Sequence, residues 1–273
     1  QRRINEFLLT APLIKSKHGA VEKKLTGSIN FKNVDFIYPH TGIHAIKDFS
    51  LQIKKGEKIA IVGRTGSGKS TIAQLLLRMY DAQKGELSYD GIAVQDFKLE
   101  NLRDQLSYVP QDVFLFSDSI KNNIRFGNAN ASLAEVEEAA KAANIYTEIN
   151  TFEEKFETMV GERGVTLSGG QKQRISIARA LIKKPEIVIF DDCLSAVDAR
   201  TEKTIITNLY EYLQERTAII ITHRIFSLFN FDKIVVMDDG KIVEQGTHSE
   251  LITLNGLYAE MYQKQQQSDA GHV

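Results

Sequence analysis

The residues Gly63-Arg64-Thr65-Gly66-Ser67-Gly68-Lys69-Ser70 match the phosphate-binding pattern GxxxxGK[ST] and decide the fold. The apolar run Ile59–Val62 before this loop predicts a buried strand, and Ser70–Met79 after it is expected to form a helix. Glycines let successive backbone N–H groups point at phosphate oxygens, and the helix N-terminus adds partial positive charge. Lys69 is expected to reach the β- and γ-phosphates, and the Ser70 hydroxyl to ligate Mg²⁺. The nucleotide-binding residues predicted from this stretch are Arg64, Thr65, Gly66, Ser67, Gly68, Lys69, Ser70 and Thr71.

Charge and composition limit the class of protein around this loop. The chain has 273 residues with 34 Lys and Arg against 35 Asp and Glu, which argues against a protein that holds nucleic acid by bulk charge. Hydrophobic residues make up 42% and charged residues 25%, which excludes an extensively disordered chain. The single cysteine, Cys193, excludes an internal disulfide framework and fits a reducing compartment. No apolar run approaches the roughly 20 residues of a membrane-spanning helix. A chain that starts at Gln1 without a signal peptide is expected to be a piece of a longer protein.

Alternating apolar residues predict strands on both sides of the loop. From Ser28 the alternation changes phase before Val34, Phe36 and Tyr38, which predicts a bulge. Further strands are expected at Glu86–Tyr89, closed by an Asp90–Gly91 turn, and at Ile187–Phe190, Ala218–Ile221 and Ile234–Met237.

Helices are expected where a Ser or Thr is followed three positions later by Glu or Gln, the spacing of a capping box. This spacing occurs at Ser132, Ser168 and Thr247, and a helical apolar period follows the first two. Strands before and after this region enclose a mostly helical segment. The pattern therefore predicts an α/β core with an inserted helical subdomain over residues of about 112–183.

Asp191 is the second anchor of the predicted site. It follows the apolar run Ile187–Phe190, so it should lie at the carboxyl end of a buried strand, beside the phosphate loop. An acid after an apolar run is usually a strand end that meets solvent. Together with a phosphate loop, a carboxylate at this place can hold the Mg²⁺ ion that Ser70 also contacts.

At Leu167-Ser168-Gly169-Gly170-Gln171 the chain resembles the signature of the nucleotide-binding domain of ATP-binding cassette (ABC) transporters. The resemblance continues, in the family order, through Gln111 after Val109-Pro110, Ser195-Ala196-Val197-Asp198, and His223 after Ile220-Ile221-Thr222. It covers about residue 2 to residue 262. Two further segments are similar to those of exporters: the loop Gly161-Glu162-Arg163-Gly164 and the stub Arg2–Leu9. The chain as a whole resembles one half of bacterial heterodimeric multidrug exporters.

The resemblance implies a fold and a division of the chain. The fold is an α/β phosphate-loop NTPase core, a mixed sheet flanked by helices, with an antiparallel β subdomain and the inserted helical subdomain. Residues 1–27 are expected to be the end of the last membrane helix with a linker, and residues 28–262 the nucleotide-binding domain. The polar composition of residues 263–273 predicts a disordered tail. The implied cofactors are ATP and Mg²⁺.

The resemblance also assigns roles to individual residues. Gln111 would ligate Mg²⁺ together with Ser70 and Asp191, and His223 would contact the γ-phosphate and the attacking water. Tyr38, ahead of Pro39, matches the aromatic that stacks on adenine, although it could equally pack with the nearby phenylalanines. The signature residues Ser168, Gly169, Gly170 and Gln171 would close on the ATP held by a second nucleotide-binding domain. The spacing of the capping box alone indicates only a helix cap.

Asp192 departs from the family pattern, in which efficient members usually carry Glu after the Mg²⁺-associated Asp. Asp is one methylene shorter, about 1.5 Å of reach along a C–C bond. A misplacement of roughly 1 Å can cost on the order of a hundredfold in rate. Asp192 could still act as the base if the backbone shifts or a second water bridges the gap. We therefore expect weak hydrolysis at this chain's own loop.

The expected function is that of an ATPase domain which powers an ABC exporter through ATP-dependent pairing of two nucleotide-binding domains. Its partners would be a second such domain and the transmembrane domain of the same polypeptide, with no nucleic acid. The domain, itself soluble, would lie at the cytoplasmic face of the bacterial inner membrane. One alternative is a nucleotide-binding regulatory half that scarcely hydrolyses ATP. The other is a soluble relative that acts in DNA repair or translation, but no coiled-coil insertion, tandem cassette or basic face is visible in the sequence.

Overall fold

A computed structural model describes residues 12–161, 167–194, 199–225 and 230–270 of the chain. The predicted strand before the phosphate loop is β3 (Lys58–Gly63), and the helix after it is α2 (Lys69–Leu76). This helix begins one residue earlier and ends three residues earlier than the apolar pattern suggests. Arg78 has a φ of 48°, a left-handed conformation that cannot continue a helix.

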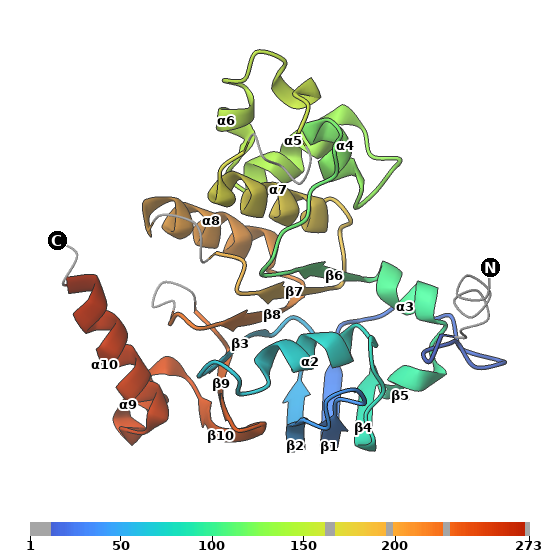
Figure 1. The fold of residues 1–273 in the computed structure, drawn as a ribbon, viewed down its shortest axis with the longest axis vertical. Helices are drawn as coiled ribbons and strands as arrows, with labels where there is room; N and C mark the ends of the chain where they lie inside the picture. Colours follow the sequence, from blue (N-terminus) through green and yellow to red (C-terminus); the bar gives the residue numbers. More distant parts are fainter. Residues whose placement is uncertain (1–11, 162–166, 195–198, 226–229, 271–273) are drawn as a thin grey trace.

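A six-stranded mixed sheet forms the centre of the molecule (Figure 1). Its strand order is β10 (Lys241–Gly246), β9 (Lys233–Asp238), β3, β8 (Thr217–Thr222), β7 (Ile187–Asp191) and β6 (Leu106–Val109). All neighbours pair in parallel except β10, which is antiparallel to β9. The carboxyl ends of β3 and β7 therefore lie at one edge, where the loop and Asp191 meet.

The two faces of this sheet are covered by different helices. On β7, Ile187 and Ile189 belong to an apolar cluster with the residues of α2, whereas Val188 and Phe190 belong to one with the helical subdomain and α8 (Ala199–Tyr212). This division follows from the alternation of side chains along a strand. Figure 1 shows α2 below the sheet, with α7 and α8 above it.

A separate antiparallel sheet packs on the α2 side. Its order is β2 (His44–Ile53), β1 (Ile29–Ile37), β4 (Lys84–Tyr89) and β5 (Ile92–Ala93). The predicted bulge is confirmed, because the register of β1 with β2 shifts between Phe31 and Val34. The predicted turn is confirmed as well: Asp90 and Gly91 have φ values of 49° and 77° and close the hairpin of β4 with β5. The 3₁₀ turn η1 (Val94–Asp96) and α3 (Leu99–Asp104) lead from this hairpin to β6.

The helical subdomain lies between β6 and β7 in the sequence, as predicted. It contains α4 (Ile120–Arg125), α5 (Leu133–Ala142), α6 (Tyr146–Ile149), the 3₁₀ turn η2 (Lys155–Glu157) and α7 (Gly169–Leu181). The capping boxes predicted at Ser132 and Ser168 are both formed at the starts of α5 and α7. α7 packs against α4, α5 and β6 and so connects this subdomain to the sheet.

The C-terminal region forms two helices, α9 (His248–Leu254) and α10 (Leu257–Ala270), whereas the sequence pattern suggests one. The capping box predicted at Thr247 is present. Asn255 has a φ of 53° and ends α9, which is the left-handed conformation common at helix C-termini. α10 continues through Ala270, into the segment 263–273 for which the polar composition predicts disorder. Its glutamines are good helix formers, so a helix that begins at Leu257 can extend through them.

Candidate nucleotide-binding site

The phosphate loop follows β3 and is fixed by two close backbone contacts. Gly63 has a φ of 156°, and a Cβ on it would lie 2.2 Å from the carbonyl oxygen of Met237 in β9. Gly68 has a φ of 96°, and its Cβ would lie 2.5 Å from the carbonyl oxygen of Ala45 in β2. Only glycine fits these positions, so the loop can lie against both sheets and curl before α2 begins.

Lys69 lies inside this curl. Its Nζ donates hydrogen bonds to the carbonyl oxygens of Gly63 and Arg64, each at 2.8 Å, and lies 3.4 Å from Ser67 Oγ. Burial lowers the pKa of Lys69 to about 8, and the carboxylates of Asp191 and Asp192 act in the opposite direction. A positive charge held in the loop with little water around it attracts a phosphate strongly.

Asp191 lies at the end of β7, where the sequence predicts it, and is 4% exposed. Ser70 Oγ donates to its Oδ1 at 3.2 Å, and the Tyr108 hydroxyl donates to its Oδ2 at 3.1 Å. Burial raises the pKa of Asp191, while the hydrogen bonds from Tyr108 and Ser70 oppose this shift. Burial also raises the pKa of the Tyr108 phenol, so it remains a donor.

The contact between Ser70 and Asp191 fits the predicted magnesium site. Mg²⁺ prefers oxygen ligands and is usually held by one or two carboxylates together with substrate phosphates. Among the described residues, no three His, Cys, Asp or Glu side chains are arranged to hold a metal ion by themselves. Ser70 and Asp191 nevertheless present oxygen atoms of the kind that hold Mg²⁺ together with substrate phosphates.

Asp192 follows directly and has a φ of 46°, a left-handed conformation that turns the chain away from β7. Its N–H donates to the carbonyl oxygen of Ile221 at 2.8 Å. Gln111 Nε2 lies 3.4 Å from Asp192 Oδ2, and Thr222 Oγ1 lies 3.5 Å from Asp192 Oδ1. The structure thus brings together two of the predicted catalytic residues, Asp192 and Gln111.

A cleft of about 430 Å³ contains most of the predicted nucleotide-binding residues. Tyr38 lines it, and the Tyr38 hydroxyl lies 2.9 Å from Thr71 Oγ1 and 2.8 Å from Gln74 Oε1. The ring of Tyr38 also packs edge-on against Phe36 and Tyr80, so it has a packing role at the wall of the cleft. The predicted residues that line this cleft are Tyr38, Thr65, Gly66, Gly68, Lys69, Ser70, Thr71, Gln111, Asp191 and His223.

Two predicted residues of the phosphate loop, Arg64 and Ser67, do not line the cleft. Arg64 is exposed and forms an ion pair with Glu260 of α10 at 3.4 Å. Ser67 is buried and its hydroxyl accepts from Lys69, so it supports the loop from within.

The signature residues are not part of this cleft. Ser168 Oγ accepts from the N–H of Gln171 at 3.2 Å, and Gln171 Oε1 accepts from the N–H of Ser168 at 2.9 Å. Gln171 Nε2 donates to Glu148 of α6, and Arg174 makes two hydrogen bonds to the same carboxylate. Figure 1 shows α7 and α2 on opposite sides of the sheet. The chain therefore does not bring its own signature to its own phosphate loop.

Sequence reasoning missed Tyr108 and Thr222 as members of the site. Thr222 immediately precedes His223 and could have been found from the motif order. Tyr108 gives no such local signal, because its contact depends on the register of β6 with β7. Three predicted segments fall wholly or mostly outside the described residues: Arg2–Leu9, Gly161-Glu162-Arg163-Gly164 and Ser195-Ala196-Val197-Asp198.

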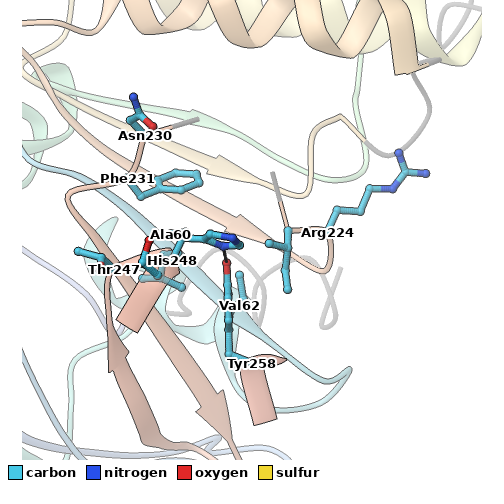
Figure 2. Close-up of a pocket in the computed structure, with 11 residues that line it drawn as sticks. Ala60, Val62, Arg224, Asn230, Phe231, Thr247, His248 and Tyr258 are labelled. Carbon is cyan, nitrogen blue, oxygen red and sulfur yellow. Dashed lines mark hydrogen bonds between the residues drawn. The ribbon is translucent and has the colours of Figure 1, made fainter. Parts of the chain in front are cut away.

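A second cavity, of about 370 Å³, lies between the sheet and the C-terminal helices (Figure 2). Figure 2 shows the imidazole of His248 between Phe231 and the hydroxyl of Tyr258, and His248 Nδ1 lies 2.8 Å from that hydroxyl. None of the predicted site residues lines this cavity.

Comparisons with known proteins agree with the geometry of the cleft. A family model described as ABC transporter matches residues 46–195, just over half of the chain. The chain is 45% identical over 264 residues to a probable multidrug resistance ABC transporter ATP-binding/permease protein of Bacillus subtilis, covering 97% of this chain and 45% of that protein. It is 44% identical over 243 residues to an ATP-dependent lipid A-core flippase of Photobacterium profundum, covering 89% of this chain and 42% of that protein.

A solved structure gives the same result. The structure of a bacterial Atm1-family ABC exporter with ATP bound matches with a TM-score of 0.92 and 40% identity, covering 97% of this chain and 46% of that one. The chain thus spans less than half the length of these relatives. Among the described residues, no helix has the length and apolar character to cross a membrane. The extent of the match and the agreement of the folds place the chain in the ABC transporter family, as one of its ATP-binding domains.

Proposed function

We propose that this chain is the ATPase domain that powers an ABC exporter from the cytoplasmic face of a bacterial inner membrane. The observation that carries this proposal is the cleft in which Lys69, Ser70 and Asp191 converge at the start of α2. The similarity of this chain to the structure of an exporter with ATP bound also supports the proposal. The rest of the transporter, including its transmembrane domain, would lie in the part of the relatives that this chain does not cover.

The residues of the cleft divide the work of binding and hydrolysis. Backbone N–H groups of the loop and the charge of Lys69 bind the phosphates, and Tyr38 faces the base. Ser70, Asp191 and Gln111 would hold Mg²⁺, which supplies compensating positive charge beside the β- and γ-phosphates when it is bound. His223 would orient the attacking water. Most of the rate enhancement would come from positioning and fixed charges.

The position of the signature residues, at the start of α7, indicates that the partner is a second nucleotide-binding domain. Ser168 and the N-terminus of α7 lie on the opposite side of the sheet from α2, yet the first turn of α7 carries N–H groups that suit a phosphate. A second nucleotide-binding domain, arranged head to tail, would supply its signature to this cleft and receive Ser168 in its own. ATP would then join the two domains, and its hydrolysis would separate them. Alone in solution the chain should be mainly monomeric, which light scattering in saturating ATP would check.

Binding of Mg·ATP is the first test of this function. Calorimetry on the folded chain should show saturable binding of ATP with Mg²⁺, and Lys69→Met should abolish it while the chain still unfolds cooperatively. Equal binding by the unsubstituted chain and by Lys69→Met would refute the assignment of the phosphate loop.

A second candidate function is slow hydrolysis of ATP in this cleft, and it rests on Asp192. Its carboxylate lies near Gln111 and Thr222, and it is shorter than the Glu of efficient family members, so this cleft would bind ATP and turn it over slowly. Asp192→Glu should raise turnover in the assembled transporter with its natural partner domain. Asp104→Glu, at an exposed carboxylate of α3, is the matched control.

Single-turnover measurements with the partner's site disabled separate a slow ATPase from a purely regulatory half. Phosphate release that becomes faster in Asp192→Glu supports the slow ATPase. No release from either form supports the regulatory half. Release that is fast in the unsubstituted chain and unchanged in Asp192→Glu would show that the length of this side chain does not limit the rate.

A further inference from the structure

Both carboxylate oxygens of Asp191 accept a hydrogen bond, and the second donor has no role in the function proposed above. Ser70 Oγ lies 3.2 Å from Oδ1, and the hydroxyl of Tyr108 lies 3.1 Å from Oδ2. The two donors differ in kind. Ser70 is itself a predicted metal ligand, whereas the phenol of Tyr108 is a neutral group that donates to the other oxygen of the carboxylate.

The place of Tyr108 follows from the parallel pairing of β6 with β7. Tyr108 is in register with Ile189, and Asp191 lies two residues further along β7, on the same face of the sheet. This is the face on which α2 packs, because Ile189, the buried residues of α2 and the ring of Tyr108 belong to one apolar cluster. A tyrosine can span the diagonal step to Asp191 and place its hydroxyl at the carboxyl end of the strand.

A hydrogen bond to Oδ2 determines how Asp191 can bind a cation. A carboxylate can bind through one oxygen or through both. Ca²⁺ takes six to eight oxygens and accepts carboxylates in either manner, whereas Mg²⁺ requires a near-ideal octahedron at shorter distances. With Oδ2 bonded to Tyr108, the carboxylate is held against rotation and offers Oδ1, the oxygen beside Ser70.

We propose that Tyr108 is a positioning residue that makes Asp191 a one-oxygen ligand and so favours Mg²⁺ over Ca²⁺ in the nucleotide site. This inference rests on the proposed function, because the ion enters the cleft with ATP. Groups that hydrogen-bond to metal ligands typically change metal affinity on the order of tenfold to a hundredfold when they are removed. The effect of Tyr108 should therefore be large enough to measure by binding alone.

The variant Tyr108→Phe removes only the hydroxyl and keeps the ring in the apolar cluster. ATP binding to the chain is measured by calorimetry in three buffers that contain EDTA, MgCl₂ or CaCl₂. Tyr108→Phe should weaken binding in MgCl₂ on the order of tenfold, leave binding in EDTA unchanged, and bring the affinities in MgCl₂ and CaCl₂ closer together. The matched control is Tyr212→Phe, because the hydroxyl of Tyr212 also donates one hydrogen bond, to the carbonyl oxygen of Leu181, outside the cleft.

A double-mutant cycle tests whether Tyr108 acts through Asp191. In an Asp191→Asn background, Tyr108→Phe should cause no further change in the magnesium dependence of ATP binding. An equal loss of affinity in EDTA and in MgCl₂ would show that the hydroxyl only supports the fold, and it would overturn the inference. Thermal unfolding of Tyr108→Phe beside Tyr212→Phe measures the loss of stability that any buried phenol hydrogen bond would cause.

Two negative results have different meanings. If the unsubstituted chain binds ATP with Mg²⁺ and Tyr108→Phe binds it equally well in all three buffers, only the role of Tyr108 is refuted. If the unsubstituted chain binds no ATP in any buffer, the proposed function is refuted and the role of Tyr108 falls with it.

Discussion

Replacement of Gly68 by alanine tests whether the phosphate loop is held in place by its contact with β2. A Cβ at this position lies 2.5 Å from the carbonyl oxygen of Ala45 and 3.0 Å from Ile46 Cδ1, and the backbone has a φ of 96°. The left-handed conformation costs alanine about 1–2 kcal/mol. Displacement of the loop from β2 adds about 1–3 kcal/mol, the usual cost of overpacking. We therefore expect Gly68→Ala to lower the free energy of unfolding by about 2–5 kcal/mol.

Gly91→Ala is the matched control for the backbone term. Gly91 has a φ of 77° in the hairpin turn, and a Cβ there meets no atom within 4 Å. Gly91→Ala should therefore cost only about 1–2 kcal/mol. Denaturant unfolding of the two variants gives the difference, which measures the contact of Gly68 with β2 alone.

The contact of Gly68 with β2 should also affect the affinity of the loop for Mg·ATP. A loop pushed away from β2 moves its N–H groups and the start of α2 relative to the phosphates. Gly68→Ala should weaken binding of Mg·ATP at least about tenfold, which corresponds to 1.4 kcal/mol, whereas Gly91→Ala should leave it unchanged. If calorimetry and unfolding show no difference between the two variants, the reasoning from this contact is refuted.

Substitutions at three other residues have expected outcomes. Tyr38→Ala should weaken ATP binding by about 1–3 kcal/mol through loss of stacking, and Tyr38→Phe should keep it; equal losses in calorimetry would contradict stacking. A hydrogen bond from Lys184, with those of the helix cap, lowers the pKa of Glu135 from its ordinary 4.5 to about 2. Because the folded-state pKa is the lower one, the stabilisation is complete above pH 4.5 and is lost as the pH falls towards 2. Glu135→Gln should therefore flatten the pH dependence of urea unfolding in that range, and an unchanged slope would argue against it. Arg174→Lys should lower the free energy of unfolding by about 1–2 kcal/mol, because Lys cannot make the two hydrogen bonds to the half-exposed Glu148; thermal melts no lower than those of the unsubstituted chain would refute this.

Local sequence signals predict much of this fold. The apolar run before Asp191 is a strand, and the residues at Ser132 and Ser168 form complete capping boxes. These features succeed because each depends on side chains within three or four positions of one another. The break between α9 and α10 at Asn255 also has a local signal, the Asn255-Gly256 pair, which is a turn dipeptide.

The parts that the sequence does not predict depend on pairing between distant segments. Tyr108 reaches Asp191 only because β6 lies beside β7 in one particular register, and no local pattern specifies that register. The sequence predicts Gln111 and Asp192 as site residues. It does not predict that Gln111 Nε2 lies 3.4 Å from Asp192 Oδ2, because this distance also depends on how distant segments pair. Likewise, local sequence does not predict that Ser168, at the start of α7, lies outside the cleft, because this depends on which face of the sheet each helix covers.

The pairing of β6 with β7 also bears on the order in which the chain folds. The two strands are separated by 78 positions (187 − 109), and an unstructured loop of that length costs about 4 kcal/mol to close, from (3/2)RT ln n. A helical subdomain that has already folded holds its two ends side by side and removes most of this entropy. The helices between the strands should therefore acquire hydrogen-exchange protection before β6 and β7 do. Asp191 and Tyr108 would then come into contact only late in folding, so the proposed magnesium site would be among the last features of the domain to form.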